Sequence, residues 1–258
     1  MSRSPFGRHE LGQNFLVDAA VVRRIVHLAQ RTPGPLVEWG TGDGAITVEL
    51  ATLGREVSGL DIDPVKARRL DERTGPHVCI SEGDILRHAP PPGSTVISNI
   101  PFNLTTPILR HLLAGRHWQH AIVITQWEVA RKRAGIGGTT QLTAQWWPWL
   151  SFSLDRRIPA AAFRPRPTVD AGLLLIDRRA DPLVPTAQQR TYQRWITRTF
   201  TGPGRGLPQI LTNSGLPPRA ARAFCARHRF VTRGLPRDLN AEQWAEAFRL
   251  LPQSGHGR

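Results

Sequence analysis

The chain is poor in the residues that build disulfide frameworks and metal sites. Its 258 residues include two cysteines, Cys79 and Cys225, which lie far apart in the sequence. Nine histidines are present, but they show no spacing typical of metal ligands. The cysteine pattern excludes a fold that depends on disulfides, and neither residue type predicts a metal site.

Long apolar runs are also missing. No segment approaches the roughly 20 apolar residues that a membrane-spanning helix needs. The first eight residues, 1–8, are too few and too polar for a signal peptide, and we expect them to be disordered. An apolar fraction of 40% is nevertheless sufficient for a real core. We therefore expect a soluble, cytoplasmic protein without a membrane partner.

Lysine is scarce, because Lys66 and Lys132 are the only two, yet the formal net charge is +14. Arginine carries almost all of the positive charge. Its planar guanidinium forks phosphates and stacks on bases, which suits RNA. Codon bias in a GC-rich genome could explain the choice of arginine over lysine, but it does not explain the net charge. The composition predicts an acidic partner.

The positive charge is concentrated in the C-terminal third. Residues 179–258 hold 13 basic and 4 acidic side chains, whereas residues 1–178 hold 21 and 16. A solvated helical surface could carry such an excess without function. A nucleic-acid footprint is the interpretation that we favour.

Strand and helix patterns alternate along the first two thirds of the chain. Apolar runs predict strands at 36–39, 57–60, 77–80, 95–98, 121–125, 149–154 and 172–176. Helical spacing predicts helices at 19–30, 45–53, 64–73, 105–113 and 128–134, and then at 187–200, 207–212, 218–228 and 241–250. The alternation indicates an α/β domain with a mostly parallel sheet covered on both faces. We place this domain at residues 1–179 and a small all-α domain at residues 180–258.

Glycines and acids follow successive predicted strands. Gly40 and Gly42 stand in the turn after the first strand, where glycine lets the backbone approach a ligand closely. Asp61 ends the second strand, at the place that suits ribose hydroxyls, and Asp84 follows the third strand, where it could accept from an adenine amine. Each signal is common alone, but together they predict an adenosyl ligand.

A nicotinamide-dependent dehydrogenase satisfies part of the same pattern. Gly40, Gly42 and Ala45 match the dinucleotide fingerprint, and Asp61 would serve its ribose. Such an enzyme has no set role for Asp84, nor for the tetrapeptide that follows the fourth strand. Both features favour a methyltransferase.

That tetrapeptide is Asn99-Ile100-Pro101-Phe102. An amino group conjugated to a ring is a poor nucleophile, because its lone pair is delocalised. The Asn99 side-chain oxygen and the Pro101 carbonyl could accept its two protons and free the lone pair. Phe102 offers a face on which an extruded base can stack. An ordinary strand-to-loop exit is the alternative interpretation of the tetrapeptide. In this context, however, the motif predicts methylation of a nucleobase amine.

Six segments together resemble the rRNA adenine dimethylases. They are Leu11–Leu16, the turn at Gly40, Asp61, Asp84, Asn99–Phe102 and Phe163–Val169. The resemblance covers nearly the whole chain. It implies a class I S-adenosylmethionine-dependent methyltransferase, with a Rossmann-like, mostly parallel sheet, a small helical RNA-binding domain and rRNA as the partner.

The resemblance also implies roles for individual residues. The cofactor-binding residues would be Asn14, Leu16, Gly40, Gly42, Asp61, Asp84 and Asn99. The catalytic residues would be Asn99, Pro101, Phe102 and Phe163. Phe163 would be a second wall of the base pocket, although a core aromatic beside a proline turn fits the sequence as well. RNA contacts are predicted, from the basic character, at Arg131, Lys132, Arg133, Arg219, Arg222 and Arg227. For the oligomeric state, we expect a monomer by default.

Two branches of the family fit the motifs. The erythromycin-resistance type modifies one adenosine of 23S rRNA, and the other branch dimethylates adenosines of small-subunit (16S) rRNA. The first is favoured by the arginine excess, by Ile100 and Phe102 where small-subunit enzymes usually have Leu and Tyr, and by 131–135 and 138–149, which look like actinobacterial resistance enzymes. A non-catalytic RNA-binding assembly factor that kept the fold is a further alternative.

Overall fold

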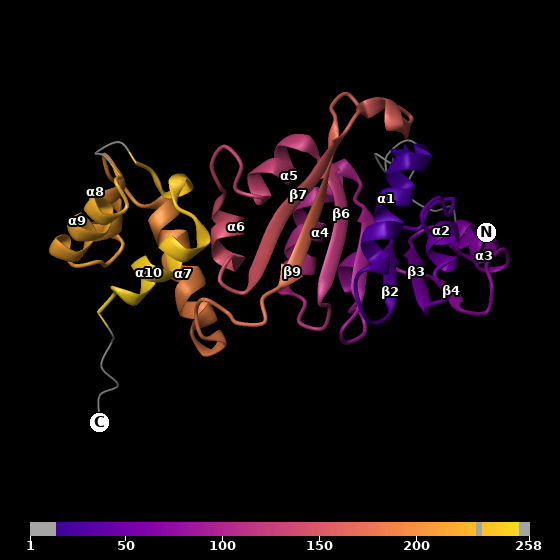
Figure 1. The fold of residues 1–258 in the computed structure, drawn as a ribbon, viewed down its shortest axis with the longest axis horizontal. Coiled ribbons are helices and arrows are strands. Elements are labelled where there is room, and N and C mark those ends of the chain that lie inside the picture. The colour runs from indigo at the N-terminus through magenta and orange to yellow at the C-terminus, as the bar shows by residue number, and fades with distance from the viewer. Residues whose placement is uncertain (1–13, 231–233, 253–258) are drawn as a thin grey trace, which may run out of the picture. The chain divides into compact units, whose positions relative to one another are not determined.

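The computed structural model describes residues 14–230 and 234–252 of the chain. The segment 1–8, for which we expect disorder, lies outside the described residues. The chain divides into two compact units (Figure 1). The first holds the residues up to Arg131 together with Ser153–Asp177, and the second holds Lys132–Phe152 and the residues from Arg178 onward. The last crossing between the units lies close to the predicted boundary at 179/180, but the smaller unit also includes the Lys132–Phe152 segment.

The first unit is built on a seven-stranded sheet in the order β4-β3-β2-β5-β6-β9-β7 (Figure 1). The strands are β2 (Leu36–Trp39), β3 (Val57–Asp61), β4 (Val78–Glu82), β5 (Thr95–Asn99), β6 (His120–Gln126), β7 (Leu150–Ile158) and β9 (Ala171–Arg178). β2 to β6 run parallel, and β9 is antiparallel to β6. The sheet is therefore mostly parallel, as the alternation of elements predicts.

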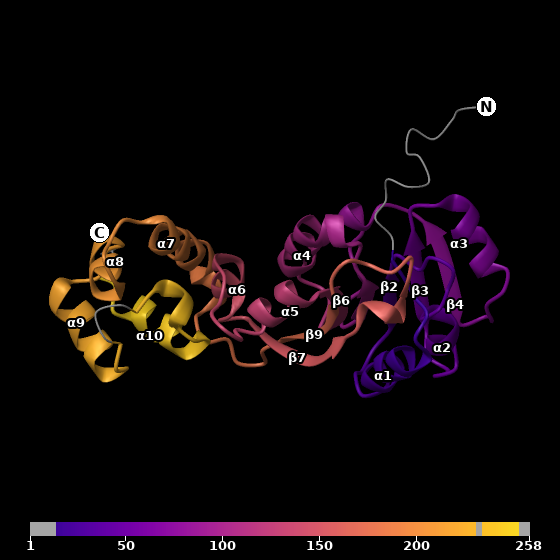
Figure 2. The same ribbon diagram turned by 90° about the horizontal axis from the view of Figure 1, so that it is seen from above.

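Helices cover both faces of this sheet. They are α1 (Ala19–Gln30), α2 (Thr47–Ala51), α3 (Pro64–Asp71), α4 (Thr105–Ala114) and α5 (Trp127–Arg133). Figure 2 shows α1 and α2 on one side and α4 and α5 on the other. The central strands are apolar at consecutive positions, as in β5, where Val96 and Ile97 are both fully buried. Successive side chains point to opposite faces of a strand, so continuous apolar runs are required when both faces are covered.

The strand order places a topological switch at β2. The chain moves outward from β2 through β3 to β4, and then returns to the other side of β2 with β5. The loops after β2 and β5 therefore leave the sheet in opposite directions. This separation opens a crevice beyond the carboxyl ends of the strands, which is where open α/β sheets bind ligands.

A separate two-stranded ribbon crosses this end of the first unit. β1 (Phe15–Leu16) pairs antiparallel with β8 (Phe163–Arg164), with Phe15 opposite Arg164 and Leu16 opposite Phe163. The main-chain amide of Val17 also donates to the oxygen of Ala162 at 2.8 Å. These contacts join the N-terminal segment to the loop between β7 and β9, and we call β1 with its flanking residues Asn14 and Val17 the strap.

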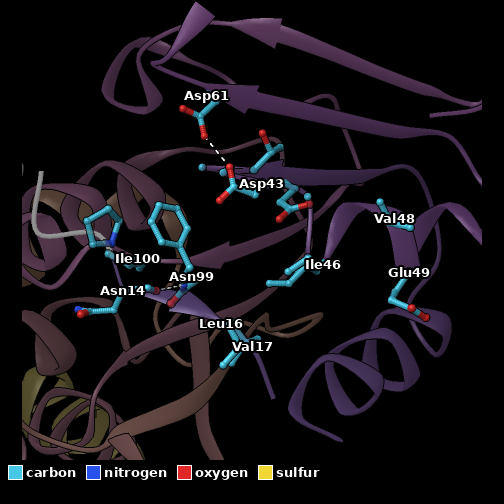
Figure 3. Close-up of a pocket in the computed structure, with 18 of the residues that line it drawn as sticks. Asn14, Leu16, Val17, Asp43, Ile46, Val48, Glu49, Asp61, Asn99 and Ile100 are labelled. Carbon is cyan, nitrogen blue, oxygen red and sulfur yellow. Dashed lines mark hydrogen bonds between the residues drawn. The ribbon is translucent and has the colours of Figure 1, made fainter. Parts of the chain in front are cut away.

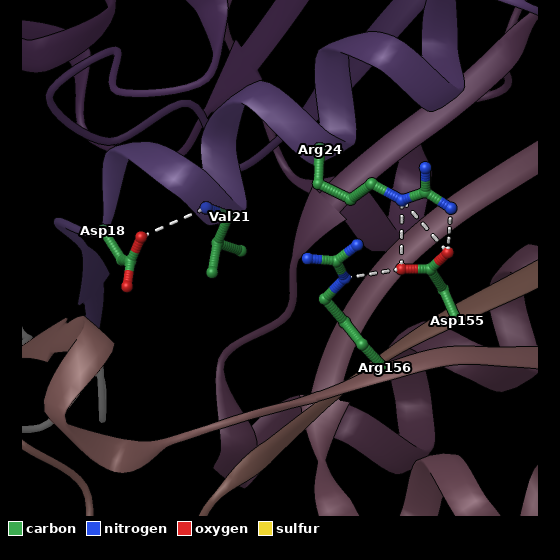
Figure 4. A network of polar contacts seen from close by, with 5 residues as sticks. All are labelled: Asp18, Val21, Arg24, Asp155 and Arg156. Carbon is green, nitrogen blue, oxygen red and sulfur yellow. Dashed lines mark hydrogen bonds and ion pairs between the residues drawn. The ribbon is translucent and has the colours of Figure 1, made fainter.

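An ion-pair network holds the strap's neighbour α1 on the sheet (Figure 4). The side chain of Asp18 caps α1 by accepting from the amides of Ala20 and Val21, at 2.8 and 3.2 Å. One turn later, the guanidinium of Arg24 donates to the Asp155 carboxylate of β7. Arg156 donates to the same carboxylate at 2.8 Å. The cap fixes the start of α1, and the ion pair fixes the middle of the helix against β7.

The second unit is helical and has an aromatic core. Its helices are α6 (Gln141–Trp146), α7 (Gln189–Thr201), α8 (Leu207–Asn213), α9 (Pro218–Arg227) and α10 (Ala241–Arg249). The Trp195 ring lies 5.5 Å from Trp244 and 5.7 Å from Phe248, measured between ring centroids. The Tyr192 hydroxyl donates to the Ala144 oxygen at 3.0 Å and joins α7 to α6. Large aromatic rings thus supply much of the buried area of a small unit.

Candidate active site

A cavity of about 450 Å³ lies at the carboxyl ends of β2, β3 and β5 (Figure 3). Its walls are the glycine turn after β2, the end of β3, the loop after β5 and the strap. The lining includes six of the seven predicted cofactor residues, namely Asn14, Leu16, Gly40, Gly42, Asp61 and Asn99. Segments from both sides of the topological switch therefore meet here, as expected for a ligand site of this fold class.

Asp61 shapes the glycine turn. One of its carboxylate oxygens accepts from the Gly42 amide at 2.7 Å, and the other accepts from the Asp63 amide at 2.9 Å. Gly40 and Gly42 have positive φ values of 78° and 55°, which favour glycine at both positions. Each carboxylate oxygen has a further lone pair, so Asp61 can hold the turn and still accept from hydroxyl groups of a ligand.

Glu38 is a buried carboxyl in the cavity wall. Only 2% of its surface is exposed, and burial raises its pKa to about 8, in spite of a 2.5 Å hydrogen bond from the Thr47 hydroxyl. The carboxylate of Asp61 pushes the pKa in the same direction as burial. Glu38 is thus mainly protonated at neutral pH in the ligand-free protein, and a nearby cation would favour its ionised form.

A lysine from α3 ties the strap to the glycine turn. The ammonium of Lys66 lies 4.1 Å from the centroid of the Phe15 ring and 3.3 Å from a carboxylate oxygen of Asp43. The Phe15 ring also lies over Gly42, where an added Cβ would come within 3.3 Å of it. Phe15 and Asp43 both line the cavity, and sequence reasoning missed both. Their positions next to Asn14 and Gly42 were the available signal.

Asn99 stands where β5 leaves the sheet. Its amide nitrogen donates to the main-chain oxygen of Asn14 at 2.7 Å (Figure 3). The acceptor is a carbonyl, so the nitrogen has to face the strap, and the side-chain oxygen is left for a ligand. The structure thus brings together Asn14 and Asn99, which are 85 residues apart.

Pro101 and Phe102 follow at the cavity wall. The Pro101 oxygen accepts from the Leu104 amide at 2.9 Å, which leaves its second lone pair for another donor. The Phe102 ring is half-buried and meets Phe163 edge-on, with 6.4 Å between centroids. A side-chain acceptor, a main-chain acceptor and an aromatic face therefore lie within four consecutive residues.

Two predicted residues lie away from the cavity. Phe163 is fully buried in the core, where its ring meets Phe102 edge-on and its main chain pairs with Leu16 of the strap; this is the core-aromatic position that the sequence also allowed. Asp84 does not line the cavity; its carboxylate caps a short 3-10 turn, Ile85–Arg87, by accepting from the Leu86 amide at 2.9 Å. The proposed contacts of Phe163 with a base and of Asp84 with adenine stay predictions.

The predicted RNA residues fall into two groups. Three have partners within the chain: Arg131 donates to Glu128 at 2.9 Å, Arg133 donates to the hydroxyls of Thr140 and Thr143, and Arg227 donates to Glu246 at 2.6 Å. The other three, Lys132, Arg219 and Arg222, are exposed. The ion pairs of Arg131 and Arg227 reduce the charge that is free to meet a phosphate, whereas the hydroxyls that bind Arg133 are neutral.

The described residues contain no group of three or more His, Cys, Asp and Glu side chains that could hold a metal ion. Within 14–230 and 234–252, no helix has the length and apolar character needed to cross a bilayer. Cys79 is exposed and Cys225 is buried, and both thiols are free.

The chemistry of the cavity fits S-adenosylmethionine. Its volume lies in the range of small-molecule sites. Glu38, Asp43 and Asp61 supply acidic groups for a ligand that carries a positive charge and ribose hydroxyls. The glycine turn brings its main chain to the cavity wall, and Leu16 and Ile46 supply apolar surface. The described residues thus suit the donor that the motifs predict.

Comparison with known proteins identifies the family. The family model for ribosomal RNA adenine dimethylase matches residues 6–252. The mycinamicin-resistance protein MyrB of Micromonospora griseorubida is 46% identical over 252 residues, which is 96% of this chain and 80% of that protein. An rRNA adenine N-6-methyltransferase of Corynebacterium diphtheriae is 42% identical over 217 residues, or 83% and 86% of the two chains.

A solved structure agrees with these matches. The crystal structure of the 23S rRNA methyltransferase ErmE has a TM-score of 0.84 and 31% identity, and the match covers 93% of this chain and all of that one. The predicted fold class, a class I methyltransferase sheet followed by a small helical unit, is confirmed. Sequence, fold and cavity lead to one conclusion: the chain belongs to the ribosomal RNA adenine dimethylase family.

Proposed function

We propose that this protein transfers a methyl group from S-adenosylmethionine to the exocyclic amine of one adenosine in 23S rRNA. Methylation there would confer resistance to macrolide, lincosamide and streptogramin B antibiotics. The observation that carries the proposal is the oriented side chain of Asn99 beside the cavity. Similarity to the 23S rRNA methyltransferase ErmE supports the choice of the large-subunit rRNA, and similarity to the mycinamicin-resistance protein MyrB supports the resistance phenotype.

The residues after β5 would prepare the amine. The Asn99 oxygen and the Pro101 carbonyl accept its two protons and draw the nitrogen toward a tetrahedral geometry. The Phe102 ring stacks on the extruded base and fixes its plane. S-adenosylmethionine, when bound, supplies an electrophilic methyl group on a sulfonium. The protein contributes chiefly by holding the amine in line, so positioning dominates the rate.

No strong general base is needed before attack. The amine is neutral when it reacts, and the proton that it sheds afterwards can pass to water. Glu38 is a cavity carboxyl with a raised pKa, but it is bound to Thr47 behind the glycine turn. We assign Glu38 to the turn and to charge balance, and not to proton transfer.

The test is to locate the methylated nucleotide. Purified protein and radiolabelled S-adenosylmethionine are incubated with protein-free 23S rRNA in one reaction and with protein-free 16S rRNA in another. The modified base is then mapped by mass spectrometry. We expect methyladenosine at one site of 23S rRNA. Label in 16S rRNA alone would favour the small-subunit branch. Binding of rRNA without uptake of label, together with no binding of S-adenosylmethionine by calorimetry, would favour a non-catalytic assembly factor.

The cellular consequence has its own readout. Expression in a macrolide-sensitive strain should raise the inhibitory concentration of erythromycin, whereas the variant Asn99→Ala at equal abundance should not. The protein is proposed to act as a cytoplasmic monomer, with the helical unit, predicted at 180–258, contacting RNA. Light scattering of the pure protein measures the oligomeric state directly.

A further inference from the structure

α7 carries a row of three arginines on its solvent face. Arg190, Arg194 and Arg198 follow one another at intervals of four residues and are all exposed. Residues four apart lie on the same side of a helix. The buried side chains of α7, which are Tyr192, Trp195, Ile196 and Thr199, occupy the opposite side. We call these three arginines the α7 ridge.

The ridge has no acidic counterpart. α7 contains no Asp or Glu, and among the described residues none of the three guanidiniums forms an ion pair. Elsewhere in the same unit, basic side chains do find acids: Glu246 accepts from both Arg227 and His228. Arg227 of α9 is therefore neutralised by α10, whereas among the described residues all three arginines of α7, like Arg219 and Arg222 of α9, are left without an acidic partner.

This arrangement works against the stability of the helix. Like charges four residues apart repel each other, and the ridge contains two such pairs. Arg190 lies in the first turn, where the helix dipole disfavours a positive charge, whereas Arg198 lies in the last turn, where the dipole favours it, so the repulsion within the row is not offset by the dipole as a whole. A surface selected only for solubility would interleave both signs. An uncompensated row that destabilises its own helix is better explained by an anionic ligand.

The orientation of the ridge is fixed by the packing of α7 on α6. The Gln145 side chain donates to the Thr197 hydroxyl at 2.8 Å, and the Gln193 side chain donates back to the Gln145 oxygen at 3.3 Å. The Tyr192 hydroxyl bonds to Ala144 from the same side. These contacts prevent α7 from rolling, so its arginines are presented on a rigid element.

We propose that the α7 ridge binds the phosphate backbone of the rRNA substrate. Successive arginines are separated by about 6 Å along the axis, so the ridge spans about 12 Å. B-form DNA presents a phosphate about every 3.4 Å of axis along each strand, and A-form RNA rises less per nucleotide, so several phosphates of an RNA helix fall within that span. Each guanidinium can fork a phosphate, and such contacts position the RNA without reading its sequence. The inference rests on the proposed function, because it takes rRNA as the partner.

The experiment compares two variants that lose the same charge. One is Arg190→Gln/Arg194→Gln/Arg198→Gln. The other removes three exposed arginines of the first unit that form no ion pair with any described residue, as Arg23→Gln/Arg68→Gln/Arg69→Gln. Binding to protein-free 23S rRNA is measured across a salt series. Loss of three phosphate contacts should reduce the slope of log K against log salt by roughly 2 to 3 in the ridge variant, and clearly less in the control.

Further readouts separate RNA contact from a structural role. The ridge variant should keep its melting temperature, or gain a few degrees from lost repulsion, and should keep its affinity for S-adenosylmethionine. Its KM for rRNA should rise while kcat at saturating rRNA stays near the wild-type value. Lowered stability, or a fall in kcat alone, would contradict the proposal.

Other outcomes overturn the proposal in distinguishable ways. Equal slopes for the ridge variant and the control would show that only net charge matters. If Arg219→Gln/Arg222→Gln on α9 reduced the salt slope and the ridge variant left it unchanged, the RNA would bind at α9 and not at the ridge. Ridge-dependent binding to phosphatidylglycerol vesicles, with rRNA binding intact, would assign the ridge to a membrane. Failure of the proposed function would appear instead as wild-type protein that does not methylate 23S rRNA.

Discussion

The side-chain nitrogen of Asn99 donates to the main-chain oxygen of Asn14 at 2.7 Å and so joins the end of β5 to the strap. The strap is held in turn by β8, through the pairing of Leu16 with Phe163. The orientation of the Asn99 amide therefore depends on the strap being folded over the cavity. In the proposed mechanism, this hydrogen bond would couple closure of the strap over the cavity to preparation of the amine.

Asn99→Asp tests that coupling. The substitution keeps the shape of the side chain but replaces the donor with a carboxylate, which is repelled by the Asn14 oxygen. We expect the strap to loosen, with a rise of about tenfold in the Kd for S-adenosylmethionine, which corresponds to the loss of one hydrogen bond. Calorimetry measures this Kd. A Kd within twofold of the wild type would show that the bond does not hold the strap.

Phe102 is predicted to act through its aromatic face alone. Stacking of a base on an aromatic ring contributes about 1–3 kcal/mol, so Phe102→Leu should lower kcat/KM for rRNA by roughly 10- to 100-fold. Phe102→Tyr preserves the face and should stay within about threefold of wild type. Steady-state kinetics with 23S rRNA compares the two. Equal losses in both variants would mean that packing against Phe163, and not stacking, governs this position.

Glu38 should make the ligand-free protein less stable as the pH rises. Burial raises its pKa to about 8, from an unfolded value near 4.5. Between these values the folded state binds the extra proton, so the stabilisation is complete below pH 4.5 and is lost as the pH rises through about 8. Glu38→Gln remains neutral and can still accept from Thr47. Relative to this variant, the wild-type melting temperature should fall between pH 5 and pH 8.5.

Differential scanning fluorimetry in matched buffers measures this difference. Glu49→Gln provides the control, because Glu49 also lines the cavity but is exposed. A melting-temperature difference between wild type and Glu38→Gln that does not change with pH would contradict the raised pKa.

The network around Asp155 should stabilise the first unit and weaken in acid. Burial alone would raise the pKa of Asp155, but hydrogen bonds from Arg24 and Arg156 outweigh it and hold the pKa below its ordinary value. Asp155→Asn should cost about 1–2 kcal/mol at pH 7, because both arginines stay partly exposed. Denaturant unfolding measures the free energy, with the exposed Asp181→Asn as control.

The pH dependence of the same pair has a definite sign. A depressed pKa gives stability that is present above the unfolded value near 3.8 and is lost as the pH falls through the folded value. The difference in the free energy of unfolding between wild type and Asp155→Asn should therefore narrow below about pH 4. A gap that stays constant down to pH 3 would show that the ion pairs contribute nothing.

The sequence predicted the sheet well, because its strands are short apolar runs with clear ends. The runs at 36–39 and 95–98 correspond to β2 and β5, and the residues that follow each of them, Gly40 and Asn99, meet in one cavity. Parallel strands put their carboxyl ends at a common edge, so order along the chain was enough to predict this meeting.

Other features depend on contacts that leave no local pattern. β1 and β8 have two residues each, too few to show a period, and they exist because Phe15 and Leu16 pair with residues about 150 positions later. α6 has no counterpart among the helices that helical spacing predicts, and it is stabilised by side-chain hydrogen bonds to α7. In the sequence Arg133 looks like a surface charge, but its guanidinium donates to Thr140, the N-cap of α6, and to Thr143 within α6.

The most direct test of the account is the rate of methyl transfer by Asn99→Ala. At saturating S-adenosylmethionine and 23S rRNA, loss of one preorganised hydrogen bond should reduce the single-turnover rate by about 100-fold or more, with the fold intact by circular dichroism. Asn103→Ala, an exposed asparagine four residues away, should retain the wild-type rate. A near-normal rate for Asn99→Ala would contradict the central claim that Asn99 prepares the amine.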